Sequence, residues 1–148
     1  MKAEVIITDI SHENLVDLLS VSMYGSDRFF ARVKKKEYDK VRTDGDCHED
    51  KLARVLLNGG KISIYDCYAE DETDFYGDPA LPHEYSEDDE AMRYDVTLHD
   101  VEDGLARAFE SEECCDFVKH LMYDPCQMDL IEADALLQFI LFGDLIYG

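Results

Sequence analysis

The sequence predicts an α+β fold in which about four helices pack on a small mixed or antiparallel sheet of three to four strands. Short runs of β-branched residues alternate with longer stretches whose apolar residues recur at helical spacing. A chain of 148 residues also suits one core, so we expect residues 1–148 to form a single acidic domain. Because no glycine-rich loop follows the first predicted strand, a dinucleotide-binding fold has no support.

The first 42 residues begin with an expected strand and helix. Residues 5–10 are short and β-branched, which is typical of a strand. Ser11 has the chemistry of a helix cap, and we expect a helix over about 12–23 that ends near Gly25. Residues 28–42 hold seven of the 14 basic side chains and match the strand and helix patterns about equally, so their structure stays open.

The middle of the chain contains the strand that we expect at the centre of the sheet. After a turn signal at 44–46, the apolar residues of 52–56 indicate a short helix that stops at the glycines 59–60. Residues 61–68 then predict the central strand. The stretch 69–90 has ten acids, two of the three prolines and no Lys or Arg, so it predicts an exposed loop.

An alternating strand and a capped helix follow. Residues 92–98 alternate apolar with polar side chains, which indicates one buried and one solvated face. Thr97 and Asp100 have the spacing of a capping box. The helix that follows is expected to bury one apolar face, made by Val101, Leu105 and Ala108.

Two more helices complete the predicted fold. One covers 114–122 and breaks at Pro125, and the last begins at a second capping box, Asp129 with Glu132, and stops at Gly143. Its expected core residues are Ile131, Ala135, Leu136, Phe139 and Ile140. Residues 145–147 are expected to return as an edge strand.

The net charge of −21 lies entirely in the second part of the chain. Residues 1–61 hold 11 basic and 11 acidic side chains, whereas residues 62–148 hold three basic and 24 acidic ones. This excess repels nucleic acid and anionic membrane, so we expect neither as a direct partner.

Carboxylates fixed on a folded surface can imitate a nucleic-acid backbone and occupy a basic groove. The acidic part therefore indicates a non-enzymatic binding protein that engages a basic protein surface. In its sharpest form, the hypothesis is a nucleic-acid mimic that inhibits a basic nucleic-acid-binding protein of defence or regulation. The candidate partner-binding residues are Glu70, Asp71, Glu72, Asp74, Glu87, Asp88, Asp89, Glu90, Glu102, Asp103, Glu110, Glu112 and Glu113. The simpler interpretation is that acids on loops and outer helix faces keep a small protein in solution.

The alternative function is divalent-metal binding by the acidic loop 70–78, although its spacing does not match an EF-hand. Cys115, His120 and Cys126 are soft ligands without a familiar zinc spacing, so packing of the cysteines in the core is the favoured interpretation. The five histidines, 12, 48, 83, 99 and 120, could act with carboxylates in acid/base catalysis, but no hydrolase or phosphate-loop motif accompanies them. We therefore expect no enzyme activity and no cofactor.

The basic stretch is the last candidate surface. It contains Lys34, Lys35 and Lys36, flanked by Arg28, Arg32, Lys40 and Arg42. It could contact phosphates while Phe29, Phe30 and Tyr38 stack on bases, but the acidic excess opposes that approach. The favoured role is pairing with the acidic half of the molecule or with an acidic neighbour in a homodimer.

The compartment is expected to be the cytoplasm. No apolar stretch reaches the length of a membrane span, and an acid precedes the first apolar run, unlike in a secretory signal. The five cysteines are odd in number and irregularly spaced, so we expect reduced thiols rather than a disulfide framework.

Three stretches resemble uncharacterised acidic proteins encoded on bacterial mobile elements. They are LLNGGKISIYD at 56–66, YDVTL and DVEDGL at 94–98 and 100–105, and LLQFILFGDLIYG at 136–148. The resemblance implies a setting in conjugative elements or prophages, where small acidic inhibitors of host defence recur. It implies no activity, catalytic residue or fold.

Overall fold

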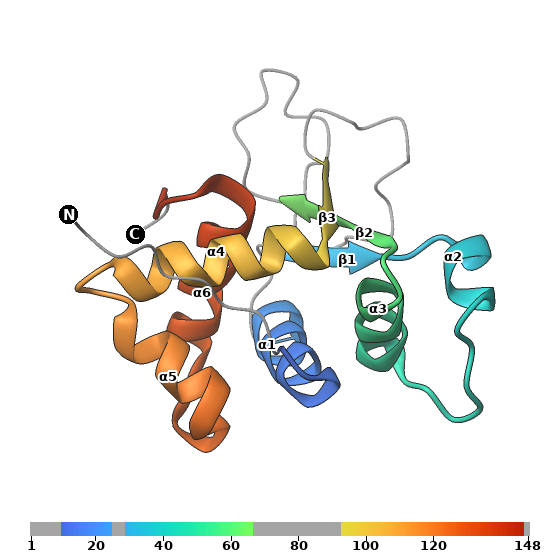
Figure 1. Ribbon diagram of the computed structural model, residues 1–148, viewed down its shortest axis with the longest axis horizontal. Helices are drawn as coiled ribbons and strands as arrows, with labels where there is room; N and C mark the ends of the chain where they lie inside the picture. Colours follow the sequence, from blue (N-terminus) through green and yellow to red (C-terminus); the bar gives the residue numbers. More distant parts are fainter. Residues whose placement is uncertain (1–9, 25–28, 67–92, 147–148) are drawn as a thin grey trace.

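The computed structural model describes residues 10–24, 29–66 and 93–146 (Figure 1). In these ranges the expected α+β class is confirmed, with an antiparallel sheet of three strands. The elements, in chain order, are α1 (His12–Tyr24), β1 (Phe29–Arg32), α2 (Lys35–Asp39), α3 (His48–Leu57), β2 (Lys61–Asp66), β3 (Arg93–Thr97), α4 (Leu98–Glu110), α5 (Cys115–Tyr123), the short 3-10 helix η3 (Pro125–Gln127) and α6 (Leu130–Phe142).

The sheet has the order β1-β2-β3, so β2 is its central strand, as predicted. Both pairs are antiparallel, and the register places Ala31 opposite Ile64 and Ile62 opposite Val96. All four of these side chains are buried. They form the apolar face of the sheet, below which α1 and α3 lie in Figure 1.

Segment 28–42, whose sequence matches the strand and helix patterns about equally, contains one strand and one helix. Phe29–Arg32 forms β1, and five residues from Lys35 to Asp39 form α2. The strand and the helix are short and only two residues apart, so neither the strand pattern nor the helix pattern continues long enough to be recognised in the sequence. This division raises the number of α-helices in the described ranges to six, rather than about four.

Local side-chain chemistry sets the helix ends where the sequence predicts them. The backbone N–H of Asn14 donates to Ser11 Oγ (3.0 Å), that of Asp100 to Thr97 Oγ1 (3.3 Å) and that of Glu132 to Asp129 Oδ1 (2.8 Å). Gly143 ends α6 with a φ of 76°, in the left-handed region that favours glycine.

Helix α6 is surrounded by the rest of the core. Its residues 135–139 are all buried, and five consecutive residues exceed one full turn, so the middle of this helix has no solvent-facing side. Helices α1, α4 and α5 all contact it. At its end, the Phe142 ring lies 6.3 Å from that of Phe29 in β1 and 5.3 Å from that of Tyr94 in β3, measured between centroids.

Two expectations for the C-terminal region are wrong. Ile131 is 74% exposed although it shares a helix face with the buried Ala135 and Gln138, because in the first turn of α6 only the side that carries Glu132 and Ala133 is covered. Residues 145–146 form no strand; the N–H of Ile146 donates instead to the side-chain oxygen of Gln138 (2.8 Å).

The expected strand at 5–10 and the expected loop at 69–90 lie outside the described residues, except for Ile10, which is buried and belongs to no strand. Within the described ranges, none of the helices combines the length and apolar character needed to cross a bilayer.

Helices α4 and α6 approach most closely at Gly104, which provides the first prediction. A Cβ atom at this position would lie 2.4 Å from the Cα of Ile140. Gly104→Ala should therefore lower the free energy of unfolding by about 1–3 kcal/mol through overpacking, despite a gain in helix propensity of about 1 kcal/mol. Urea denaturation measures this change.

Asp103→Ala is the matched control, because it places alanine at the neighbouring, exposed position of the same helix. Its free energy of unfolding should stay within about 0.5 kcal/mol of the parent. A Gly104→Ala protein as stable as the parent would show that the two helices do not meet at this glycine.

Candidate acidic docking edge

Five of the thirteen predicted partner-binding residues lie in the described part of the chain, and α4 and the turn after it bring these five together. They are Glu102, Asp103, Glu110, Glu112 and Glu113. With Asp116 at the start of α5, they form what we call the acidic edge. The other eight lie outside the described residues: Glu70, Asp71, Glu72, Asp74, Glu87, Asp88, Asp89 and Glu90.

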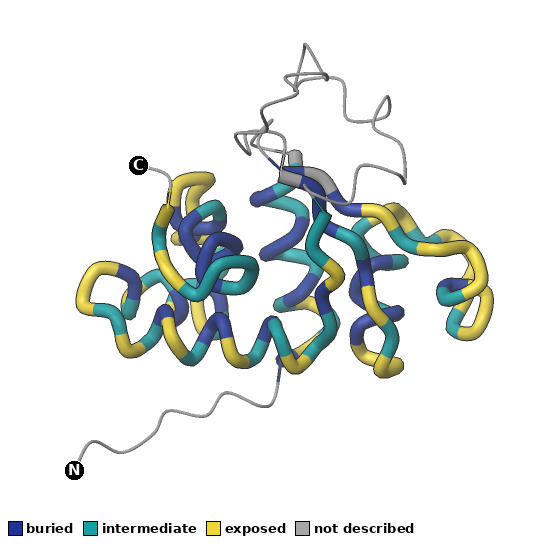
Figure 2. Tube along the Cα trace, turned by 90° about the horizontal axis from the view of Figure 1, so that it is seen from above, coloured by how far each residue is buried: buried dark blue, intermediate teal, exposed yellow. Residues whose placement is uncertain are grey.

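The amphipathic pattern of α4 decides which way the acidic edge faces. Val101, Leu105 and Ala108 are buried on the side toward α6. Asp103 and Glu110 lie on the opposite side and are exposed, seven residues or about 10.5 Å apart along the helix axis. Glu112 and Glu113 are exposed in the turn, whereas Glu102 is half-buried. The edge therefore faces solvent along the length of α4 (Figure 2).

Few positive charges offset the edge. Asp103 contacts His99 (3.2 Å), and Asp116 contacts Lys119 (3.8 Å). Both pairs are exposed and contribute about 0–1 kcal/mol each. The remaining base, Arg107, reaches toward the end of α6: a Cβ on Gly143 would lie 2.4 Å from its Nη1 atom. There its charge lies near the negative end of the α6 dipole.

The charge density of α4 is much lower than that of duplex DNA. Its 13 residues span about 19.5 Å, over which a DNA duplex carries about 11 phosphate charges. The helix carries four acids and one arginine over the same length. The acidic edge by itself therefore does not reproduce the spacing of backbone phosphates.

The basic stretch lies at the far end of the molecule from the acidic edge. Helix α2 and the α4–α5 turn stand at opposite ends of the longest axis (Figure 1), so the stretch does not fold across the edge. Lys40 pairs instead with Glu37 in its own helix (3.7 Å). Phe29 and Tyr38 are buried in the core and cannot stack on bases, which removes two of the three aromatic rings that the nucleic-acid interpretation of this stretch invoked.

Metal ligands do not gather in the described residues. No group of three or more His, Cys, Asp or Glu side chains there could hold an ion. His120 contacts the buried Glu132 through Nδ1, and Cys126 is exposed. Of the four free cysteines in the described residues, Cys114 alone is fully buried, so the expectation of core packing is wrong for Cys47 and Cys126. The loop 70–78 lies outside the described residues.

The arrangement closest to a catalytic group joins Cys47, Asp50 and His12. Asp50 occupies the middle position, because its Oδ1 lies 2.8 Å from His12 Nε2 and its Oδ2 lies 3.1 Å from Cys47 Sγ. A cysteine nucleophile needs the imidazole, not the carboxylate, next to its sulfur. Sequence reasoning missed this contact, because His12 and Asp50 are 38 residues apart and share no motif.

Electrostatics also oppose a nucleophilic role for Cys47. The hydrogen bond from its thiol to Glu49 Oε2 (2.7 Å) is the main cause that raises the pKa of Cys47 above its ordinary value. The hydrogen bond from His12 lowers the pKa of Asp50 to about 2. At neutral pH the thiol therefore stays protonated beside an ionised carboxylate, whereas catalysis requires a thiolate.

The second prediction concerns this thiol. Glu49→Gln removes the negative charge next to the sulfur, so the pKa of Cys47 should fall and its alkylation by iodoacetamide at pH 8 should become faster. Mass spectrometry after timed alkylation measures the rate for each cysteine. Cys126, exposed elsewhere in the same molecule, is the internal control. A Cys47 pKa at or below 9.0 in the parent protein would contradict the account.

Comparison with known proteins assigns the chain to no family. No protein-family model, no curated protein and no solved structure matches the chain.

Proposed function

We propose that this protein is a non-enzymatic binding protein whose acidic edge docks on a basic surface of another protein. The observation that carries the proposal is the exposure of the edge carboxylates on one side of α4 and its following turn. In the described residues, Glu112 and Glu113 form no ion pair, so both charges are available to a partner. A basic groove would supply counter-charges to these two carboxylates.

The rigidity of the edge supports the same proposal. Helix α4 is capped at Thr97 and packed against α6 through buried residues on its inner side. Its outer carboxylates are therefore held before a partner arrives, and binding requires little reordering of the backbone. Loosely tethered acids would lose more conformational entropy on docking.

The nucleic-acid-mimic form of the proposal requires more charge than α4 carries. The eight candidate acids in 70–90 would have to add to the edge to approach the density of a phosphate backbone. The proposed target is then a DNA- or RNA-binding protein of defence or regulation, as the resemblance to mobile-element proteins implies. Duplex DNA should compete with this protein for such a target.

The third prediction tests the edge with variants of equal charge. Asp103→Asn, Glu112→Gln and Glu113→Gln together remove three edge charges. At about 0.2–1 kcal/mol for each lost pair, the affinity for a captured basic protein should fall about three- to 150-fold. Glu13→Gln, Asp124→Asn and Asp144→Asn change the net charge equally on exposed residues outside the edge, and this control should bind nearly as the parent does.

Capture from a bacterial lysate at 50 mM salt identifies the partner, and titration of the purified partner gives the affinities. Binding should weaken steeply between about 50 and 200 mM salt, because charge neutralisation drives the contact. Equal loss of affinity in the edge and control variants would contradict the proposal that the acidic edge is the docking surface. Displacement by duplex DNA supports the mimic form, whereas retention in excess DNA contradicts it.

A further inference from the structure

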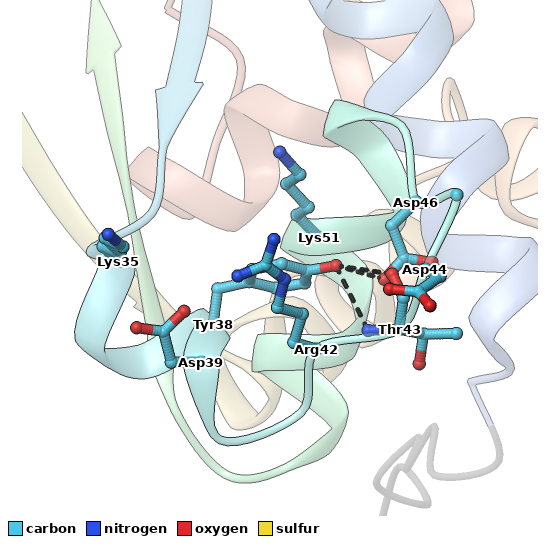
Figure 3. A pocket seen from close by; sticks show the side chains of 9 residues that line it. Lys35, Tyr38, Asp39, Arg42, Thr43, Asp44, Asp46 and Lys51 are labelled. Atoms are coloured by element: carbon cyan, nitrogen blue, oxygen red, sulfur yellow. Dashed lines mark hydrogen bonds between the residues drawn. The ribbon is translucent and has the colours of Figure 1, made fainter.

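The basic end of the molecule contains a hollow of about 350 Å³ between α2 and the start of α3. Three cationic side chains surround it from three segments: Lys35 begins α2, Arg42 lies in the loop after it, and Lys51 comes from α3. Figure 3 shows Arg42 and Lys51 close to the ring of Tyr38, with Lys35 farther from it, near Asp39. Such convergence from separate segments is a tertiary arrangement and not a consequence of the basic run alone.

Tyr38 gives the hollow a fixed floor. Its side chain is 8% exposed, and its hydroxyl donates to Asp46 Oδ2 (2.6 Å) and accepts from the N–H of Thr43 (3.3 Å). Lys51 Nζ lies 5.5 Å from the centroid of the ring, within the range of a cation–π contact. The ammonium group is therefore held over the floor while its N–H donors stay available to a ligand.

The cations of the hollow lack carboxylate partners within ion-pair distance in the described part of the chain. None of Lys35, Arg42 and Lys51 forms an ion pair there. Asp46 is already engaged, because it also accepts from Arg54 Nε (2.9 Å), a residue outside the lining. The lining holds three carboxylates, Asp39, Asp44 and Asp46, against its three cations. Counted with Arg54, which pairs with Asp46 from outside the lining, the local net charge is +1. Gathering three cations costs free energy that a bound dianion would offset.

We propose that this hollow binds the phosphate group of a small phosphomonoester. Lys35, Arg42 and Lys51 contact the phosphate oxygens, and the guanidinium of Arg42 supplies paired donors that match them. Asp39 and Asp44 accept hydrogen bonds from hydroxyl groups of the ester, which favours a polyhydroxylated phosphate over a bare anion. The site is separate from the acidic edge and does not depend on the proposed docking function.

The fourth prediction uses ribose 5-phosphate as the probe, with inorganic phosphate and ribose in parallel. Amide chemical shifts of the 15N-labelled protein are followed at constant ionic strength, so that general salt effects cancel. Ribose 5-phosphate should cause saturable shifts around residues 35–51 with a Kd of about 1 mM. If inorganic phosphate binds more weakly than ribose 5-phosphate, the ligand is a phosphate ester. If the two bind equally, the hollow recognises the free phosphate ion. Ribose alone should cause no shifts.

Charge-matched variants test the residues. Arg42→Gln with Lys51→Met should weaken binding about tenfold or more, whereas Lys36→Gln with Lys40→Gln, outside the lining, should change it less than about twofold. If the paired variant unfolds, Arg42→Gln alone tests the site, because a substitution at this exposed loop residue should not disturb the fold. Absence of saturable shifts with both phosphates, or equal weakening in the two paired variants, would overturn the proposal.

Discussion

The burial of α6 is the constraint on which the rest of the structure depends. A helix buried on all sides at residues 135–139 cannot lie at the surface, so α1, α4 and α5 must pack around it. The closest approach uses Gly104, because a Cβ there would overlap the backbone at Ile140. That contact fixes the rotation of α4 about its own axis. Once the inner side of α4 is set, Asp103 and Glu110 have to face solvent, and the acidic edge is a consequence of core packing.

The same arrangement keeps opposite charges apart. Helix α4 runs from β3 toward one end of the longest axis, while β1 leads to α2 at the other (Figure 1). Lys35, Arg42 and Lys51 thus remain near one another and away from the carboxylates of the acidic edge. Separation preserves two local potentials of opposite sign that a mixed surface would cancel. We infer that a protein of net charge −21 retains a basic hollow for this reason.

Local chemistry made much of the fold predictable from sequence. Thr97 with Asp100 and Asp129 with Glu132 form the expected caps, because a capping box needs four consecutive residues and little else. Tertiary features were not predictable. The exposure of Ile131 depends on which side of the first turn of α6 is covered, and the hollow forms because α2 packs beside α3. For the candidate site, sequence indicated the acidic residues, but the side of α4 that they occupy follows from its contact with α6.

The most direct test of the account is a measurement of surface potential at individual residues. Relaxation of amide protons by a cationic and by an anionic nitroxide cosolute reports the local sign of the charge. The cationic probe should be enriched over the anionic one at residues 110–116, and the ratio should reverse at residues 35–42 and at Lys51. Ratios that are equal at both ends of the molecule would contradict the separated potentials on which both proposed sites rest.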